Sequence, residues 1–134
     1  MQGEILYEEK LKLLPDVEIG PVPEGMRIDS HYSGHLSGLS IHGKVDGVDY
    51  VLLRPDGVLV LHVHAVITTD GGDRISVEGS GFGTATPDGR FAMKGALNYK
   101  TGSKELAWLN STQGIVDGFV DLNAREVNAK IFKL

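Results

Sequence analysis

The sequence has no cysteine among its 134 residues. This absence excludes disulfide bonds, thiolate metal sites and a cysteine nucleophile, and it agrees with a cytoplasmic protein, which is what we expect. No apolar run approaches the length of a membrane-spanning helix. The first residues, MQGEILYEEKLKL, lack the basic and apolar regions of a signal peptide. We therefore expect a protein without membrane contact.

The chain also lacks a strong excess of charge of one sign. Its formal net charge is −5, and its acidic and basic residues are scattered rather than clustered. A nucleic-acid-binding protein usually carries a basic patch, so we expect no nucleic acid partner. A chain of this length with 41% hydrophobic residues forms one compact core. The sequence therefore predicts a single domain over residues 1–134.

Long helical patterns are absent, and short segments rich in β-branched and aromatic residues alternate in polarity between turn residues. The chain contains 18 glycines, many of them in these turns. Residues 14–26, with three prolines, are predicted to form a connection. The pattern predicts an all-β antiparallel barrel or sandwich of about eight to ten strands with little or no helix. The predicted strands are 4–14, 26–32, 35–45, 48–54, 58–69, 73–82, 90–100, 105–112, 114–122 and 126–134.

Turn signals at residues 46–47 and 55–56 predict how three of these strands pair. A two-residue hairpin at Asp-Gly 46–47 would place Lys44 opposite Asp49. A two-residue hairpin at Pro-Asp 55–56 would place Asp49 opposite His62. Because side chains alternate along a strand, this register predicts one polar row, Lys44, Asp49 and His62, on a face whose opposite side is wholly apolar.

His42 and His64 share the face of this row, and two interpretations of the face are open. If the apolar face forms the core, the row is an ordinary surface ion-pair row. If the mixed face lines a cavity, His62 and His64 are candidate acid–base residues, and Asp49 would orient His62.

His-x-His on a strand is also a spacing found in metal sites, because both imidazoles project to the same side. His42 could supply a third ligand. The cupin metal motif requires a glutamate shortly after the second histidine, and threonines occupy residues 68–69 instead. We predict no metal and no cofactor.

Trp108, in the segment LAWLN, is the only tryptophan in the chain. It is predicted either to pack in the core or to form a cavity wall on which Asn110 orients a ligand. Tyr50 is a further candidate for a cavity wall.

Several segments together resemble the bacterial domain-of-unknown-function 3237 family. They are EIGPVPEGMR, YSGHLSG, GVDYVLLRPDGVLVLHVHAVITTDGGDRISV and ELAWLNST, and the resemblance spans nearly the whole chain. It implies a small up-and-down β-barrel of the allene-oxide-cyclase-like kind, commonly dimeric, with no general activity attached to the family. Family members tend to have an aspartate in place of His62 and often an arginine in place of His64.

Two functions follow from the residues and the resemblance. The first is a barrel that binds a small apolar or amphipathic organic molecule and catalyses a cofactor-independent isomerase, cyclase or lyase reaction. The alternative is a non-catalytic oligomeric or ligand-carrier barrel. A homodimer is expected in either case. In the first, the predicted catalytic residues are His62, His64 and Asp49, and the predicted ligand-binding residues are Tyr50, Trp108, Asn110 and His42.

Overall fold

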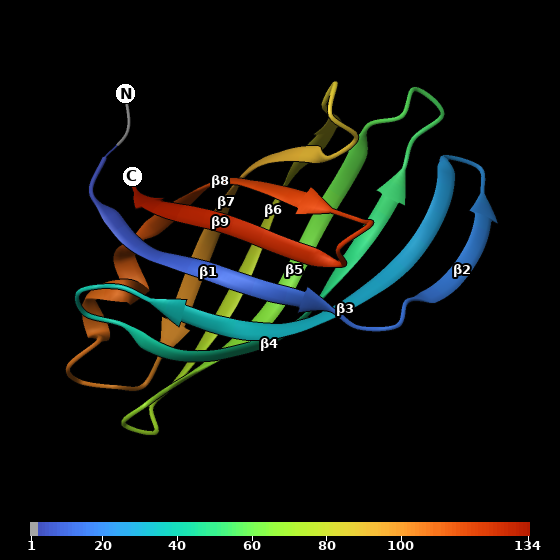
Figure 1. Cartoon of the computed structure of the whole chain (residues 1–134). Helices are drawn as coiled ribbons and strands as arrows, with labels where there is room; N and C mark the ends of the chain where they lie inside the picture. Colours follow the sequence, from blue (N-terminus) through green and yellow to red (C-terminus); the bar gives the residue numbers. More distant parts are fainter. Residues whose placement is uncertain (1–2) are drawn as a thin grey trace.

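The computed structural model describes residues 3–134 and consists of nine β-strands and one short 3₁₀ helix (Figure 1). The predicted all-β fold with little helix is confirmed. The strands are β1 (Ile5–Leu13), β2 (Val17–Val22), β3 (Gly25–Ser37), β4 (His42–Leu53), β5 (Leu59–Thr69), β6 (Arg74–Ala85), β7 (Phe91–Thr101), β8 (Gln113–Asp121) and β9 (Glu126–Lys133), and the helix is η1 (Ala107–Ser111).

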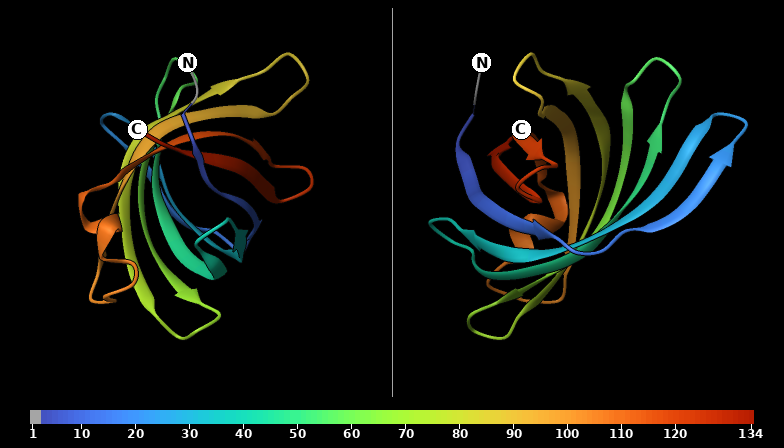
Figure 2. Two further views of the ribbon diagram at one scale, coloured as in Figure 1. Left: turned by 90° about the vertical axis from the view of Figure 1, so that its left-hand side faces the viewer. Right: turned by 45° about the vertical axis from the view of Figure 1, so that its right-hand side comes forward.

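All strand pairs are antiparallel, and each strand from β3 to β9 lies beside the next one along the chain. The sheet closes because β1 pairs with β9 on one side and with the C-terminal half of β3 on the other. The N-terminal half of β3 pairs instead with β2, so this hairpin extends beyond the barrel (Figures 1 and 2). The result is the predicted up-and-down barrel, with eight strands in the closed ring and β2 outside it.

The turn between β4 and β5 has one residue more than the predicted register allowed. The Arg54 N–H donates to the Val58 carbonyl over 2.9 Å, and Gly57 closes the turn with a φ of 87°. Glycine adopts this left-handed conformation without the steric cost that a Cβ would bring. The extra residue shifts the pairing by one, so Asp49 lies opposite Val63 and not opposite His62. The predicted polar row is therefore wrong.

The hairpin predicted at residues 46–47 is also wrong, because β4 runs through these residues without interruption. The turn between β3 and β4 lies earlier, where the Gly38 N–H donates to the Ile41 carbonyl over 2.8 Å. Gly47 has a packing role instead. A Cβ at Gly47 would lie 2.6 Å from the Tyr32 hydroxyl, so only glycine leaves room for that ring. Three predicted strands thus form two longer ones, β3 and β4.

Two further elements differ from the prediction. β2 forms as an edge strand within residues 14–26, which were predicted to be a connection. η1 replaces the strand predicted at 105–112. Leu106 and Leu109, spaced three residues apart, are buried together, which suits a 3₁₀ turn because side chains three apart lie on one side.

The two ends of the barrel differ in how they are filled. The end joined by the β3–β4 and β5–β6 turns and by η1 is closely packed, and the fully buried large side chains lie there: Tyr7, Ile41, Ile67, Ile75, Leu109 and Ile131. The end beside the β2–β3 hairpin contains a cavity. No helix within residues 3–134 is long and apolar enough to cross a membrane.

Candidate functional site

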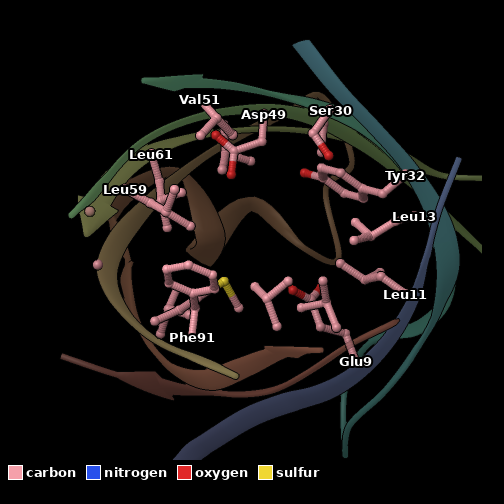
Figure 3. A pocket seen from close by; sticks show the side chains of 18 of the residues that line it. Glu9, Leu11, Leu13, Ser30, Tyr32, Asp49, Val51, Leu59, Leu61 and Phe91 are labelled. Carbon is pink, nitrogen blue, oxygen red and sulfur yellow. The ribbon is translucent and has the colours of Figure 1, made fainter. Parts of the chain in front are cut away.

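The candidate site is a cavity of about 320 Å³ inside the barrel (Figure 3). Known small-molecule sites begin at about this volume and are lined mainly by apolar side chains. Every strand of the closed ring contributes to its wall. The cavity opens at the barrel end where the β4–β5, β6–β7 and β8–β9 turns lie.

The apolar face of β5 lines this cavity. Leu59, Leu61 and Val63 point inward, and the residues between them point outward. Along β5 the interior is therefore the predicted apolar face, whereas along β4 it includes Asp49 of the predicted mixed face. The one-residue shift in register places Asp49 of β4 on the same inner face.

Asp49 replaces a backbone acceptor at an interruption in the β4–β5 ladder. The ladder runs from Asp49 opposite Val63 to Leu52 opposite Val60 with no regular pair between them. There the backbone N–H of His62 donates to Asp49 Oδ1 over 2.9 Å. Burial raises the pKa of Asp49 to about 6, although this hydrogen bond and the nearby His62 and Arg27 act in the opposite direction. Asp49 is thus a half-buried carboxyl group that ionises close to neutral pH.

Glu9 of β1 is a second carboxyl group in the cavity wall. Burial raises its pKa to about 7. Among residues 3–134 no hydrogen bond or ion pair offsets this burial. Sequence analysis missed this residue. The sequence pattern could have revealed it. Every second residue of β1 faces the interior, and Glu9 belongs to the same series as Tyr7, Leu11 and Leu13.

Tyr32 of β3 lies within electrostatic reach of both carboxyl groups. Burial raises its pKa, and the charges of Glu9 and Asp49 raise it further. The phenol is therefore neutral at ordinary pH and can donate a hydrogen bond. Figure 3 shows its hydroxyl on the side of the cavity where Asp49 and Ser30 lie. The cavity thus holds two carboxyl groups able to exchange protons near neutrality, with the Tyr32 phenol as a hydrogen-bond donor beside them.

An ion pair borders the cavity at its open end. Arg125, in the turn between β8 and β9, has a left-handed φ of 58°. Its Nη2 donates to the Leu14 carbonyl over 2.6 Å, and its Nη1 lies 3.6 Å from Asp16 Oδ2. The Leu13 N–H in turn donates to the Arg125 carbonyl over 2.9 Å. These bonds connect the β8–β9 turn to the link between β1 and β2.

His62 and His64 lie on the outer face of the barrel and not in the cavity. Their ring centroids are 5.2 Å apart, and the exposed ring of Tyr50 lies 6.1 Å from His62 and 6.0 Å from His64. His64 Nε2 also lies 3.8 Å from Glu78 Oε2. The structure therefore brings these three predicted residues together, but it separates their side chains from the Asp49 carboxylate. The geometric basis for their predicted roles, a shared cavity, is absent.

The other predicted ligand-binding residues also lie outside the cavity. His42 is exposed at the start of β4. Trp108 is 36% exposed on η1. Asn110 accepts the Thr101 N–H over 2.8 Å and donates to the Thr101 carbonyl over 3.0 Å, so it attaches η1 to the end of β7. The ligand-binding roles of these residues stay predictions.

Histidines and carboxylates do not gather into a metal site in the described part of the chain. Within residues 3–134 no three His, Asp or Glu side chains are close enough together to hold an ion. His42, His62 and His64 therefore do not come together as the three metal ligands that the His-x-His spacing suggested.

Comparison with known proteins identifies the family and the fold. The model of the family described as "Protein of unknown function (DUF3237)" matches residues 1–134, and the chain belongs to this family. No curated protein matches. A protein of unknown function from Clostridium acetobutylicum ATCC 824 is 23% identical, with a TM-score of 0.88 over 100% of this chain and 99% of that one.

Two other solved structures are similar. A β-barrel-like protein from Acinetobacter baumannii AYE is 20% identical, with a TM-score of 0.88 over 98% of this chain and 94% of that one. A structure described as an enzyme from Penicillium herquei is 21% identical, with a TM-score of 0.74 over 96% of this chain and 92% of that one. At these identities the likeness concerns the fold.

Proposed function

We propose that the barrel binds a small apolar or amphipathic organic molecule and catalyses a cofactor-independent proton-transfer reaction on it, of the isomerase, cyclase or lyase kind. The supporting observation is the pair of carboxyl groups, Glu9 and Asp49, in an otherwise largely apolar cavity, with pKa values raised to about 7 and about 6. General acids and bases work best when their pKa lies near the working pH. Raised carboxyl pKa values in a cleft also favour a functional site over a structural one.

The two carboxyl groups suit different roles at neutral pH. Asp49, with the lower pKa, is mostly ionised and is our candidate base. Glu9, with the higher pKa of about 7, holds its proton more readily and is our candidate acid. Asp49 would take a proton from a carbon beside a carbonyl, Tyr32 would donate a hydrogen bond to the oxygen that becomes negative, and Glu9 would return a proton elsewhere on the molecule. The step transfers protons only and needs no oxidant or reductant.

The fold itself is compatible with catalysis. The similar Penicillium herquei structure is described as an enzyme, so a barrel of this shape can hold an active site. The likeness does not extend to a shared substrate.

The experiment that tests this proposal measures proton exchange directly. Small bicyclic ketones are incubated with the protein in D₂O, and deuterium uptake beside the carbonyl is followed by NMR. We expect exchange above the buffer rate, and a loss of about 100-fold in Asp49→Asn. Asparagine keeps an oxygen that can accept the His62 N–H, so the fold should survive.

The control for this experiment is His64→Gln on the outer face. It should keep the exchange rate within about twofold, because its side chain is exposed outside the cavity. Unchanged exchange in Asp49→Asn, or loss of exchange in His64→Gln, would contradict the assignment of the base.

A carrier without catalytic activity is the second candidate, and the mainly apolar lining of the cavity favours it. A carrier would bind the same ketones, show no exchange above buffer, and keep its affinity in Asp49→Asn. The exchange experiment therefore separates the two functions.

We also propose that the protein forms a homodimer. The support is apolar surface on the outer face, where Phe82 of β6 is 53% exposed and lies opposite Val60 of β5. Exposed apolar patches commonly mark contacts between proteins. Light scattering at micromolar concentration should give the mass of two chains, and the mass of one chain would contradict the dimer.

A further inference from the structure

The polar side chains inside the cavity come from one wall. β1, β3 and β4 supply Glu9, Ser30, Tyr32 and Asp49. The wall formed by β5, β6, β7 and β8 faces the cavity with apolar side chains, such as Leu59, Leu61, Val77, Phe91, Met93 and Val116. Ser80 and Lys94 border the cavity but are exposed on the outside of the barrel. In Figure 3, Asp49, Ser30 and Tyr32 lie on one side, and Leu59 and Phe91 lie on the other.

The apolar wall also contains a stretch without side chains. Gly81 of β6 and Gly95 of β7 lie opposite each other and both line the cavity. A Cβ at Gly81 would lie 2.1 Å from the Lys94 carbonyl oxygen, and a Cβ at Gly95 would lie 2.5 Å from the Ser80 carbonyl oxygen. The two strands are therefore close together, and their bare backbone leaves room opposite the polar wall.

Within the described residues, the ionisable carboxyl groups of the cavity have no basic side chain beside them in its interior to offset their charge. Glu9 and Asp49 are its interior ionisable carboxyl groups, and within residues 3–134 no lysine, arginine or histidine side chain lines its interior. Arg125 at the rim already bonds to Asp16 and to the Leu14 carbonyl, and Lys94 is exposed on the outside of the barrel. A bound anion would face two carboxylates without a cation to offset them. In a site of low dielectric such repulsion is strong.

We propose that the cavity takes molecules without negative charge. Its ligand is a neutral or singly cationic amphipathic molecule that places hydrogen-bonding groups along β1, β3 and β4 and an apolar edge against β5 to β8. The cavity excludes carboxylates, phosphates and sulfates of the same shape. This inference rests on the proposed function, because it names the class of ligand for the same cavity.

The test compares three probes that share one apolar body and differ in charge: adamantan-1-ol, 1-adamantylammonium and adamantane-1-carboxylate. Binding is measured at pH 8 by NMR of methyl groups, with Leu59, Leu61 and Met93 reporting on the cavity. The alcohol and the ammonium ion should shift these methyl signals and bind at least about tenfold more tightly than the carboxylate.

Variants assign this difference to the two carboxyl groups. In the double variant Glu9→Gln with Asp49→Asn, the affinity for the carboxylate should rise to within about threefold of that for the alcohol. Each single variant should give part of this gain, which keeps the test usable if the double variant folds poorly. Glu78→Gln is the matched control, because it removes one negative charge from the outer face of β6 and should leave all three affinities unchanged.

The outcomes separate this inference from the function on which it rests. Cavity binding by all three probes with similar affinity, or tighter binding of the carboxylate, would overturn the charge preference and leave small-molecule binding intact. The charge preference would also be overturned if Glu78→Gln raised the affinity for the carboxylate probe as much as the cavity variants do. If none of the probes shifts the methyl signals of the cavity, small-molecule binding in the proposed function fails, and the charge preference fails with it.

Discussion

The inner and outer faces of β4 and β5 carry different chemistry, although the residues concerned are neighbours. Asp49 accepts the backbone N–H of His62, yet its carboxylate lies inside the barrel and the His62 imidazole lies outside. Histidine is the side chain whose ordinary pKa lies nearest to neutrality, so it is the first candidate for acid–base chemistry in a sequence. In the folded protein, burial brings Asp49 and Glu9 into that pH range. The position of a group relative to water matters here more than its residue type.

The largest expected effect of burying carboxyl groups on the inner face is on the free energy of unfolding. Both inner carboxyl groups have a higher pKa in the folded protein than in the unfolded chain, so the folded protein binds more protons between about pH 4 and pH 7. Stability should therefore fall as pH rises through this window, by up to about 3 kcal/mol for each group. Urea denaturation at pH 4.5 and pH 8 measures the fall.

The double variant Glu9→Gln with Asp49→Asn should remove most of that decline and be the more stable protein at pH 8. Asp56 and Asp88, with pKa values lowered to about 2, act below this window and should not disturb it. A decline of the same size in the double variant would show that other groups cause it.

Filling the cavity should weaken binding strongly, whereas a phenylalanine one residue later should not. Val63→Phe adds a ring inside the cavity, and His64→Phe adds the same ring outside. We expect affinity for adamantan-1-ol to fall by about 100-fold in the first variant, because the ring occupies the ligand's volume. Calorimetric titration measures both. Equal losses in the two variants would show that binding does not occur in the cavity.

A smaller effect concerns the polar pair in the packed end of the barrel. The Tyr7 and Tyr99 hydroxyl groups form a buried hydrogen bond of 2.8 Å, whereas Glu9 on the same strand has no such partner among residues 3–134. Tyr7→Phe should cost about 1–2 kcal/mol of unfolding free energy, because it leaves the Tyr99 hydroxyl without this partner. Adding Tyr99→Phe should cost little more. A double variant that loses twice as much as the single would contradict this coupling.

The smallest effect is expected on the outer face. His64 and Glu78 are both exposed and 3.8 Å apart, so their attraction is weakened by water. Glu78→Gln should change the free energy of unfolding by less than about 0.5 kcal/mol at pH 6. A larger loss would mean that the outer histidines contribute more to the fold than an exposed pair can.

Local patterns in the sequence were sufficient for much of the fold. Alternating polarity predicted β5 to β9 closely, because each strand shows its own period of two. The Pro-Asp signal at 55–56 predicted a turn at the right place, and Gly57 takes the left-handed position that closes it. At 46–47 the same reasoning was wrong, because Asp-Gly there serves the packing of Tyr32 against Gly47.

The site depended on features that no local pattern contains. One extra residue in the turn at 55–57 moved Asp49 to the face opposite the His62 side chain, since a one-residue slip exchanges the two faces of a strand. Glu9 could have been found from the alternation of side chains along β1. Its closeness to Tyr32 and Asp49, however, arises only when β1 pairs with β3 and closes the barrel.

The sequence by itself determined that this protein is all-β and antiparallel, because strand period and turn chemistry are local properties. Only the tertiary structure decided which face is interior and which acids share a cavity. Closure of the barrel removes one face of each strand in the closed ring from water, and this burial raises the pKa values of Glu9 and Asp49.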